Sequence, residues 1–201
     1  MRLWILFAAA LLALAPVTAG AADQPRSMAG LTLGENVQSL ADRLELDGSM
    51  PMWNRPYVSR ANILPVEGYE SGYVTYGNCK RKGTILRFKL NYKDTSEDFF
   101  NKVKSAIQKR YGGHDEWRGN AFGTLKVWKW RVDGSGKRPS TSVIIMRYVG
   151  DDGDFTEGNS IRLSFPDWLK EERECWKARQ THKEVPPLPA QRTGFEWMLP
   201  H

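Results

Sequence analysis

Residues 84–92 alternate between apolar and polar side chains, and this alternation constrains the fold more than any other feature of the sequence. In an extended chain, successive side chains point to opposite sides. The apolar side holds Leu86, Phe88, Leu90 and Tyr92, and the polar side holds Arg87, Lys89 and Asn91. A period of two with one apolar side is typical of an antiparallel strand that is buried on one face and solvated on the other.

Other segments predict further strands and three helices. Enrichment in aromatic and β-branched residues predicts strands at residues 57–63, 72–76, 125–132, 142–149 and 160–165. Apolar residues at helical spacing predict a first helix over 35–44. A second helix is expected between the capping segment 94–97 and the glycines at 112–113, and a third over 168–180 with Asp167 as N-cap.

The fold class that follows is α+β, with helices packed on antiparallel sheet structure in the order α-β-β-β-α-β-β-β-α. Both halves of the chain share one order of elements, which a pseudo-duplicated fold would explain. One continuous antiparallel sheet with helices on a face explains that order equally well. The length of 201 residues, of which 41% are hydrophobic and 26% charged, suits a single globular domain.

The N-terminus has the composition of a cleavable secretory signal peptide. Arg2 provides a basic start, residues 3–14 are apolar, and Ala19 and Ala21 form an A-x-A cleavage site. The apolar run is too short to span a bilayer, and the polar residues after it disfavour the alternative of a buried core helix. We therefore expect an exported protein, periplasmic or secreted, with no transmembrane segment. The expected parts are a signal peptide (1–21), a flexible start (22–29), one α+β domain (30–180) and a Pro-rich tail (181–201).

The net charge favours contact with anionic surfaces. The formal charge is +6, and loss of Arg2 with the signal peptide lowers it to +5. A moderately basic exported protein can be attracted to phospholipid headgroups, lipopolysaccharide or acidic polymers. Nucleic acid is not an expected partner for a protein outside the cytoplasm.

The two cysteines, Cys79 and Cys175, are expected to form a disulfide, because export places them in an oxidising compartment. The bridge would join the end of an early strand to the last helix. Two free buried thiols are the first alternative. A reactive Cys79, activated by the cations at 80–82, is the second.

The start of the expected domain resembles two families of exported proteins. Residues 30–34 (Gly-Leu-Thr-Leu-Gly), followed by Val37, Leu40 and Leu44, resemble the opening of a helix-plus-meander unit. That unit occurs in the outer-membrane assembly lipoproteins of the SmpA type and in the β-lactamase-inhibitor-like proteins. The resemblance implies an exported module that binds other proteins. The lipoproteins carry an acylated cysteine after the signal peptide, which this chain lacks.

Catalytic motifs are sparse. Of the three histidines, His114 is adjacent in sequence to Asp115 and Glu116, so a hydrolase using this histidine with either carboxylate is one alternative function. Residues 133–138 have neither the spacing of a nucleophile elbow nor that of a phosphate-binding loop. No cluster of histidines, cysteines and carboxylates has the spacing of metal ligands, so neither metal nor cofactor is expected.

Aromatic residues near cations are the remaining candidates for a site. Trp128 and Trp130 share one side of a predicted strand and are expected in the core. The binding candidates outside it are Lys80, Arg81, Lys82, Trp117, Phe195 and Trp197. Such residues can anchor a protein partner or stack on sugars. The main expectation is a non-catalytic exported module that binds a protein or a component of the cell envelope, and a binder of anionic glycans or lipid headgroups is an alternative.

Overall fold

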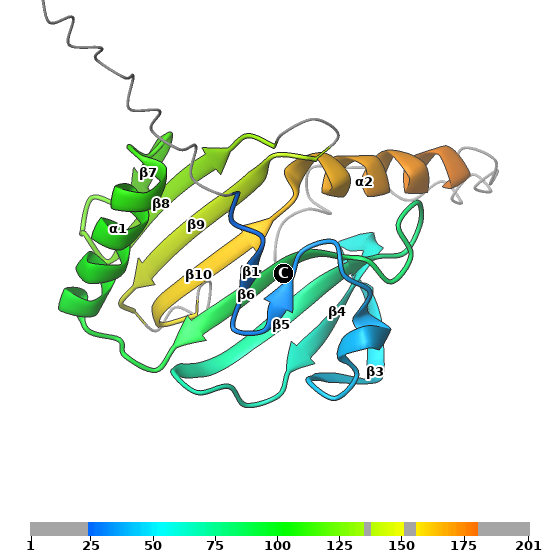
Figure 1. Ribbon diagram of the computed structural model, residues 1–201, viewed down its shortest axis with the longest axis horizontal. Coiled ribbons are helices and arrows are strands. Elements are labelled where there is room, and N and C mark those ends of the chain that lie inside the picture. The colour runs from blue at the N-terminus through cyan, green and yellow to red at the C-terminus, as the bar shows by residue number, and fades with distance from the viewer. Residues whose placement is uncertain (1–23, 135–137, 151–155, 181–201) are drawn as a thin grey trace, which may run out of the picture.

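Eight strands of the protein form one antiparallel sheet. The structure is a computed structural model that describes residues 24–134, 138–150 and 156–180. Along the chain the strands are β3 (Leu44–Met52), β4 (Arg55–Ile63), β5 (Tyr69–Gly77), β6 (Ile85–Tyr92), β7 (Glu116–Gly119), β8 (Leu125–Val132), β9 (Thr141–Tyr148) and β10 (Gly158–Ser164). In the sheet they lie in the order β3-β4-β5-β6-β10-β9-β8-β7 (Figure 1).

The sheet consists of two four-stranded meanders, β3 to β6 and β7 to β10, joined where β6 pairs with β10. Each meander is followed by a helix: α1 (Glu97–Tyr111) after β6, and α2 (Pro166–Gln180) after β10. Helix α1 packs against β8 and β9, and α2 packs against β4 and β6. Each helix therefore lies on the meander that it does not follow, and the two lie at opposite ends of the sheet in Figure 1.

The α+β class is confirmed, but the predicted element order is wrong at its first helix. Residues 35–44 contain only a short 3-10 turn, η1 (Val37–Leu40), after a small hairpin of β1 (Ser27–Met28) and β2 (Leu31–Thr32). Val37 and Leu40 are buried as expected, but Leu44 pairs with Ile63 as the first residue of β3. The apolar spacing that predicted a helix is equally satisfied by a turn that leads into a strand.

Strands β3 and β7 were not predicted, because they occupy the two ends of the sheet order. Only one residue of β3 is buried, and none of the four residues of β7 is. The register of β3 with β4 is also interrupted, between Glu45 and Met50 and between Pro51 and Met52. Edge strands such as these do not need the alternation that marks a half-buried strand.

Helix α1 begins and ends where its sequence predicts. The hydroxyl of Ser96 caps the helix by accepting the N–H of Phe99, at 3.2 Å. Glu97 lies in the first turn and Arg110 in the last, as the helix dipole favours. Gly112 terminates the helix at a φ of 84°, where a side chain would be strained. Helix α2 begins at Pro166, so Asp167 lies in its first turn and is not the N-cap.

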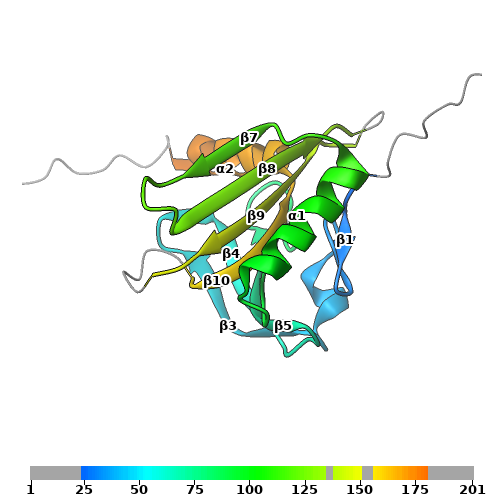
Figure 2. The same cartoon turned by 90° about the vertical axis from the view of Figure 1, so that its left-hand side faces the viewer.

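One face of the sheet carries the hydrophobic core. It packs on α1, η1 and the β1–β2 hairpin, and Figure 2 shows α1 and β1 on the same side of the sheet. The core includes Leu31, Leu33, Val37, Phe88, Leu90, Phe100, Trp130, Ile145, Leu163 and Phe165. Trp130 is buried and Trp128 packs against the same cluster, which confirms that both belong to the core.

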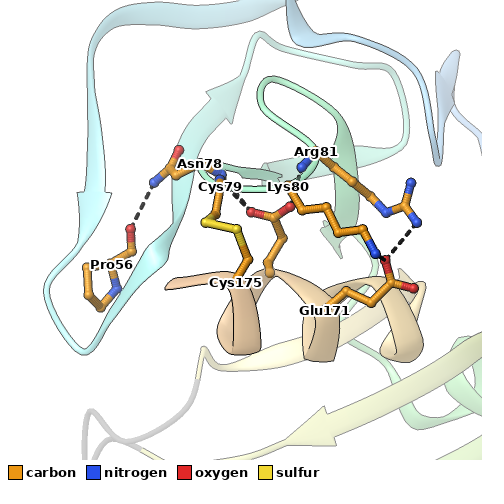
Figure 3. Close-up of a disulfide and its surroundings, with 8 residues drawn as sticks. Pro56, Asn78, Cys79, Lys80, Arg81, Glu171 and Cys175 are labelled. Carbon is orange, nitrogen blue, oxygen red and sulfur yellow. Dashed lines mark hydrogen bonds and ion pairs between the residues drawn. A yellow bond between two sulfur atoms is a disulfide. The ribbon is translucent and has the colours of Figure 1, made fainter. Parts of the chain in front are cut away.

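Cys79 and Cys175 form the predicted disulfide, with Cα atoms 6.0 Å apart (Figure 3). It links the segment after β5 to α2 and closes a loop with a sequence separation of 96. In the chain-entropy description, closing a loop of this length stabilises the fold by about 4–5 kcal/mol.

A buried carboxylate fixes the same segment to α2. Glu172 is fully buried, and its Oε2 accepts the backbone N–H groups of Asn78 at 3.1 Å and Cys79 at 2.6 Å. Its Oε1 accepts the N–H of Arg81. Gly77 makes room for this contact, because a Cβ there would lie 2.9 Å from the Glu172 carboxyl carbon and 2.5 Å from the carbonyl oxygen of Arg81.

We expect Glu172→Ala to lower the free energy of unfolding by about 3–5 kcal/mol, since it leaves buried N–H groups without an acceptor. Glu171→Ala is the matched control, because Glu171 forms partly exposed ion pairs with Lys80 and Arg81. Its loss should stay within about 1 kcal/mol. Urea unfolding with the disulfide intact measures both, and equal losses would contradict the role assigned to Glu172.

Candidate functional site

The sheet face opposite the core forms a trough of about 930 Å³. Each of the eight strands contributes to its lining. The contributions include Glu45 from β3, Arg60 from β4, Tyr73 from β5, Lys89 from β6, Arg118 from β7, Val127 from β8, Ile144 from β9 and Arg162 from β10. The trough is therefore a property of the whole sheet and has the size of a small-molecule site.

Strand register places the cations of this face next to one another. Residues directly opposite in neighbouring strands share a face. Lys89 lies opposite Tyr73 on one side and opposite Arg162 on the other. Two residues along β6, Arg87 lies opposite Thr75, which in turn lies opposite Arg60. Four cations from three different strands thus gather at the centre of the face; we call Arg60, Arg87, Lys89 and Arg162 the cation cluster.

No member of the cation cluster forms an ion pair with any carboxylate in the described part of the chain. The guanidinium of Arg60 stacks on the ring of Tyr73, 4.0 Å from its centroid. The Nζ of Lys89 donates to the hydroxyl of Thr156 at 3.3 Å. Within residues 24–134, 138–150 and 156–180, these neutral partners leave the positive charge of the cluster uncompensated.

Burial and mutual repulsion lower the pKa values of three members of the cation cluster. Burial, reinforced by the charges of Arg162 and Arg55, lowers the pKa of Arg87 from its ordinary value to about 10. Burial also lowers the pKa of Arg162 and of Lys89. A cation whose pKa is lowered by folding destabilises the folded state while it is charged. For Arg87 this effect is fully present below about pH 10 and shrinks as the pH rises above that value.

Buried polar atoms on this face lack hydrogen-bond partners. They are the Nε atoms of Arg87 and Arg162, Oγ1 of Thr75 and Oδ1 of Asn91. Thr75 is only 1% exposed and Asn91 9% exposed. Buried polar groups are nearly always satisfied in folded proteins. Four such atoms lie on this one face, and the described residues supply no partner to any of them.

Two other arginines with an unpaired Nε show why the cluster is distinctive. Arg26 donates to the carbonyl of Leu33, and Arg81 donates to Glu171 and stacks on Trp168. Each of these guanidinium groups has another acceptor within the protein. Within the described residues, the side chains of Arg87 and Arg162 have none.

The structure places the sequence-predicted binding residues elsewhere and does not bring them together. Lys80 and Arg81 are paired with Glu171 of α2 (Figure 3), and Lys82 is exposed in the same connection. Trp117, in edge strand β7, is 54% exposed and lies opposite Trp128, so it shares the core face. Phe195 and Trp197 lie outside the described residues, as do residues 1–23.

His114 is not arranged with its neighbouring carboxylates. Its ring packs edge-on against Trp128, with centroids 4.3 Å apart. Asp115 accepts the backbone N–H of Arg131, and Glu116 binds Arg118 and Lys129. In the described part of the chain, no hydrogen bond joins His114 to either carboxylate. The same part contains no group of three or more histidines, cysteines and carboxylates that could hold a metal ion.

Sequence reasoning missed the cation cluster, although part of its signal was visible. Arg87 and Lys89 were predicted on the polar side of their strand. Arg60 and Arg162 occur in strands predicted at residues 57–63 and 160–165, where a cation interrupts an otherwise apolar or small-residue pattern. Only the order of the strands shows that these cations meet.

No family model, curated protein or solved structure matches the chain. Neither helix of the described residues is long and apolar enough to cross a membrane.

We expect Arg87→Met and Arg162→Met each to raise the free energy of unfolding of the unliganded protein by about 1 kcal/mol. Each change removes a buried charge that is repelled by its neighbours and lacks an acceptor, while it keeps most of the side-chain volume. Arg173→Met, on the exposed side of α2, is the matched control and should shift stability by no more than about 0.5 kcal/mol. Urea unfolding measures all three, and a marked loss of stability in the cluster variants would show that these arginines are structural.

Proposed function

We propose that the protein is an exported, non-catalytic module that binds an anionic ligand in the trough. The observation that carries this proposal is the cation cluster, which has no carboxylate partner among the described residues and includes two guanidinium groups whose buried Nε is unpaired there. Features that destabilise a fold and satisfy no internal need are expected at functional sites. An anion bound here would supply both the missing charge and the missing acceptors.

The chemistry of the cluster favours a carboxylate or a phosphate. A guanidinium presents its donors as a planar fork that matches either group through two parallel hydrogen bonds. The buried Thr75 hydroxyl and Asn91 amide can orient further polar atoms of the ligand. This proposal keeps the expected attraction to anionic envelope components and moves it from residues 80–82 to the trough. The resemblance of residues 30–44 to exported binding proteins supports a binding role.

Export is the second part of the proposal. The disulfide is a bond that oxidising compartments favour, and residues 1–21 have the composition of a signal peptide. When the full chain is produced in a bacterium with a functional export pathway, we expect a mature protein that begins at Ala22. Its intact mass should rise by two hydrogens on reduction. N-terminal sequencing and mass spectrometry test this, and an intact Met1 or an unchanged mass would contradict it.

We expect inorganic phosphate and citrate to bind the protein with an affinity that falls as salt rises, because dissolved ions screen the attraction between the cation cluster and an approaching anion. Arg162→Met and Lys89→Met, at two residues that line the trough, should each weaken binding by about ten- to a hundredfold, the effect of losing a charge-assisted hydrogen bond. Isothermal titration calorimetry measures the affinities.

Arg173→Met is the control for this titration, because it removes the same charge from a surface outside the trough. It should bind both anions like the unmodified protein. Equal weakening in all three variants would assign the effect to net charge alone and reject the trough as the site, as would the absence of any anion binding.

A further inference from the structure

We infer that the trough takes an amphipathic anion, an alkyl chain that ends in a carboxylate or a phosphate. This inference rests on the proposed function and specifies its ligand class. It derives from the position of the cation cluster beside an apolar wall on the same sheet face.

The apolar wall begins directly at the cluster. Ile144 of β9 lies opposite Arg162 of β10. Two residues further along β9, Met146 lies opposite Val127 of β8. Leu125 extends the wall along β8. An anionic head held at Arg162 and Lys89 would therefore place its chain beside the apolar side chains of β8 and β9.

The opposite rim is apolar as well. The connection from β4 to β5 contributes Leu64, Pro65 and Val66 to the lining of the trough. Leu64 is 37% exposed, a large apolar side chain that faces the trough from the protein surface. The cluster is thus flanked by apolar surface on two sides, a distribution that a small hydrophilic anion does not need.

Elsewhere in the trough, the charged side chains of the lining either are paired with an opposite charge or are carboxylates, so an anionic head would bind at one place. Arg118, at the β7 end, is paired with Glu116. The two lining carboxylates, Glu45 and Glu70, are at the end formed by β3, β4 and β5, and Glu45 accepts from Asn62 at 3.0 Å. Uncompensated positive charge is left at the centre of the sheet, where β6 pairs with β10.

The same face is poorly suited to a sugar. Carbohydrate sites use open aromatic faces as stacking platforms. Of the tyrosines that line the trough, Tyr73 has a ring face covered by Arg60, and Tyr69 stacks on Tyr92 with centroids 5.1 Å apart. An alkyl chain needs no such platform and is bound through the burial of apolar area.

The experiment compares four probes by isothermal titration calorimetry: decyl phosphate, decanoate, decanol and inorganic phosphate. Decyl phosphate and decanoate are used below their micelle concentrations, and decanol below its solubility limit. We expect decyl phosphate and decanoate to bind at least about tenfold more tightly than inorganic phosphate, because the chain buries apolar area as the head is held by the cluster. Decanol should bind at least about tenfold more weakly than decyl phosphate, since it lacks the charge.

A pair of matched variants tests where the alkyl chain of the ligand binds. The double variant Val127→Thr/Ile144→Thr keeps the branching at Cβ of both wall residues but makes the wall polar. It should weaken decyl phosphate by about tenfold and leave inorganic phosphate unchanged. Val149→Thr makes the same kind of change at a partly exposed residue outside the trough lining, and it should change neither affinity.

The outcomes separate this inference from the proposed function. Equal affinities for decyl phosphate and inorganic phosphate would overturn the inference and leave the anion site standing. Decanol binding as tightly as decyl phosphate would overturn it too, because the charge would then play no part. Binding of no anion would reject both proposals. A parallel titration with monomeric dihexanoyl phosphatidylglycerol distinguishes two sources of the ligand. Binding of this probe would indicate a membrane lipid. If it does not bind while decyl phosphate does, the ligand is a single-chain anion.

Discussion

The antiparallel pairing of β6 with β10 is the contact on which the rest of the structure depends. It joins two four-stranded meanders into one sheet and sets Lys89 opposite Arg162. Without this pairing each meander would have an additional open edge, with unpaired backbone groups. Because each helix packs on the meander that it does not follow, α1 and α2 hold the same two halves together from opposite ends.

The two faces of the sheet contribute differently to stability, and the proposed binding site lies on the face that contributes less. An antiparallel sheet can bury one face and leave the other polar. The buried face supplies the core under α1, η1 and the N-terminal hairpin, so the other face is free to carry groups that weaken the fold. Crowded cations and unsatisfied buried polar atoms persist there because the core compensates for them, a balance common at functional sites.

The anchoring of α2 shows how a small domain adds stability where its core is thin. The disulfide lowers the conformational entropy of the unfolded chain. The Glu172 carboxylate accepts hydrogen bonds from backbone N–H groups in the segment after β5. Gly77 is needed at that point because any side chain would collide with the carboxylate and with the backbone of Arg81. The cations at 80–82 thus belong largely to a structural anchor, in which Lys80 and Arg81 neutralise Glu171.

Local signals in the sequence determined several elements on their own. Alternation identified β6, and aromatic and β-branched residues identified β8. The cap at Ser96 and the glycine at 112 bounded α1, and two cysteines in a predicted exported chain indicated the disulfide. The first helix was wrong because the spacing of Val37, Leu40 and Leu44 also fits a turn followed by a strand. Tertiary structure alone decided the strand order, and with it the trough. Arg60, Arg87 and Arg162 are far apart in the sequence, and they meet through register between strands, which no local periodicity specifies.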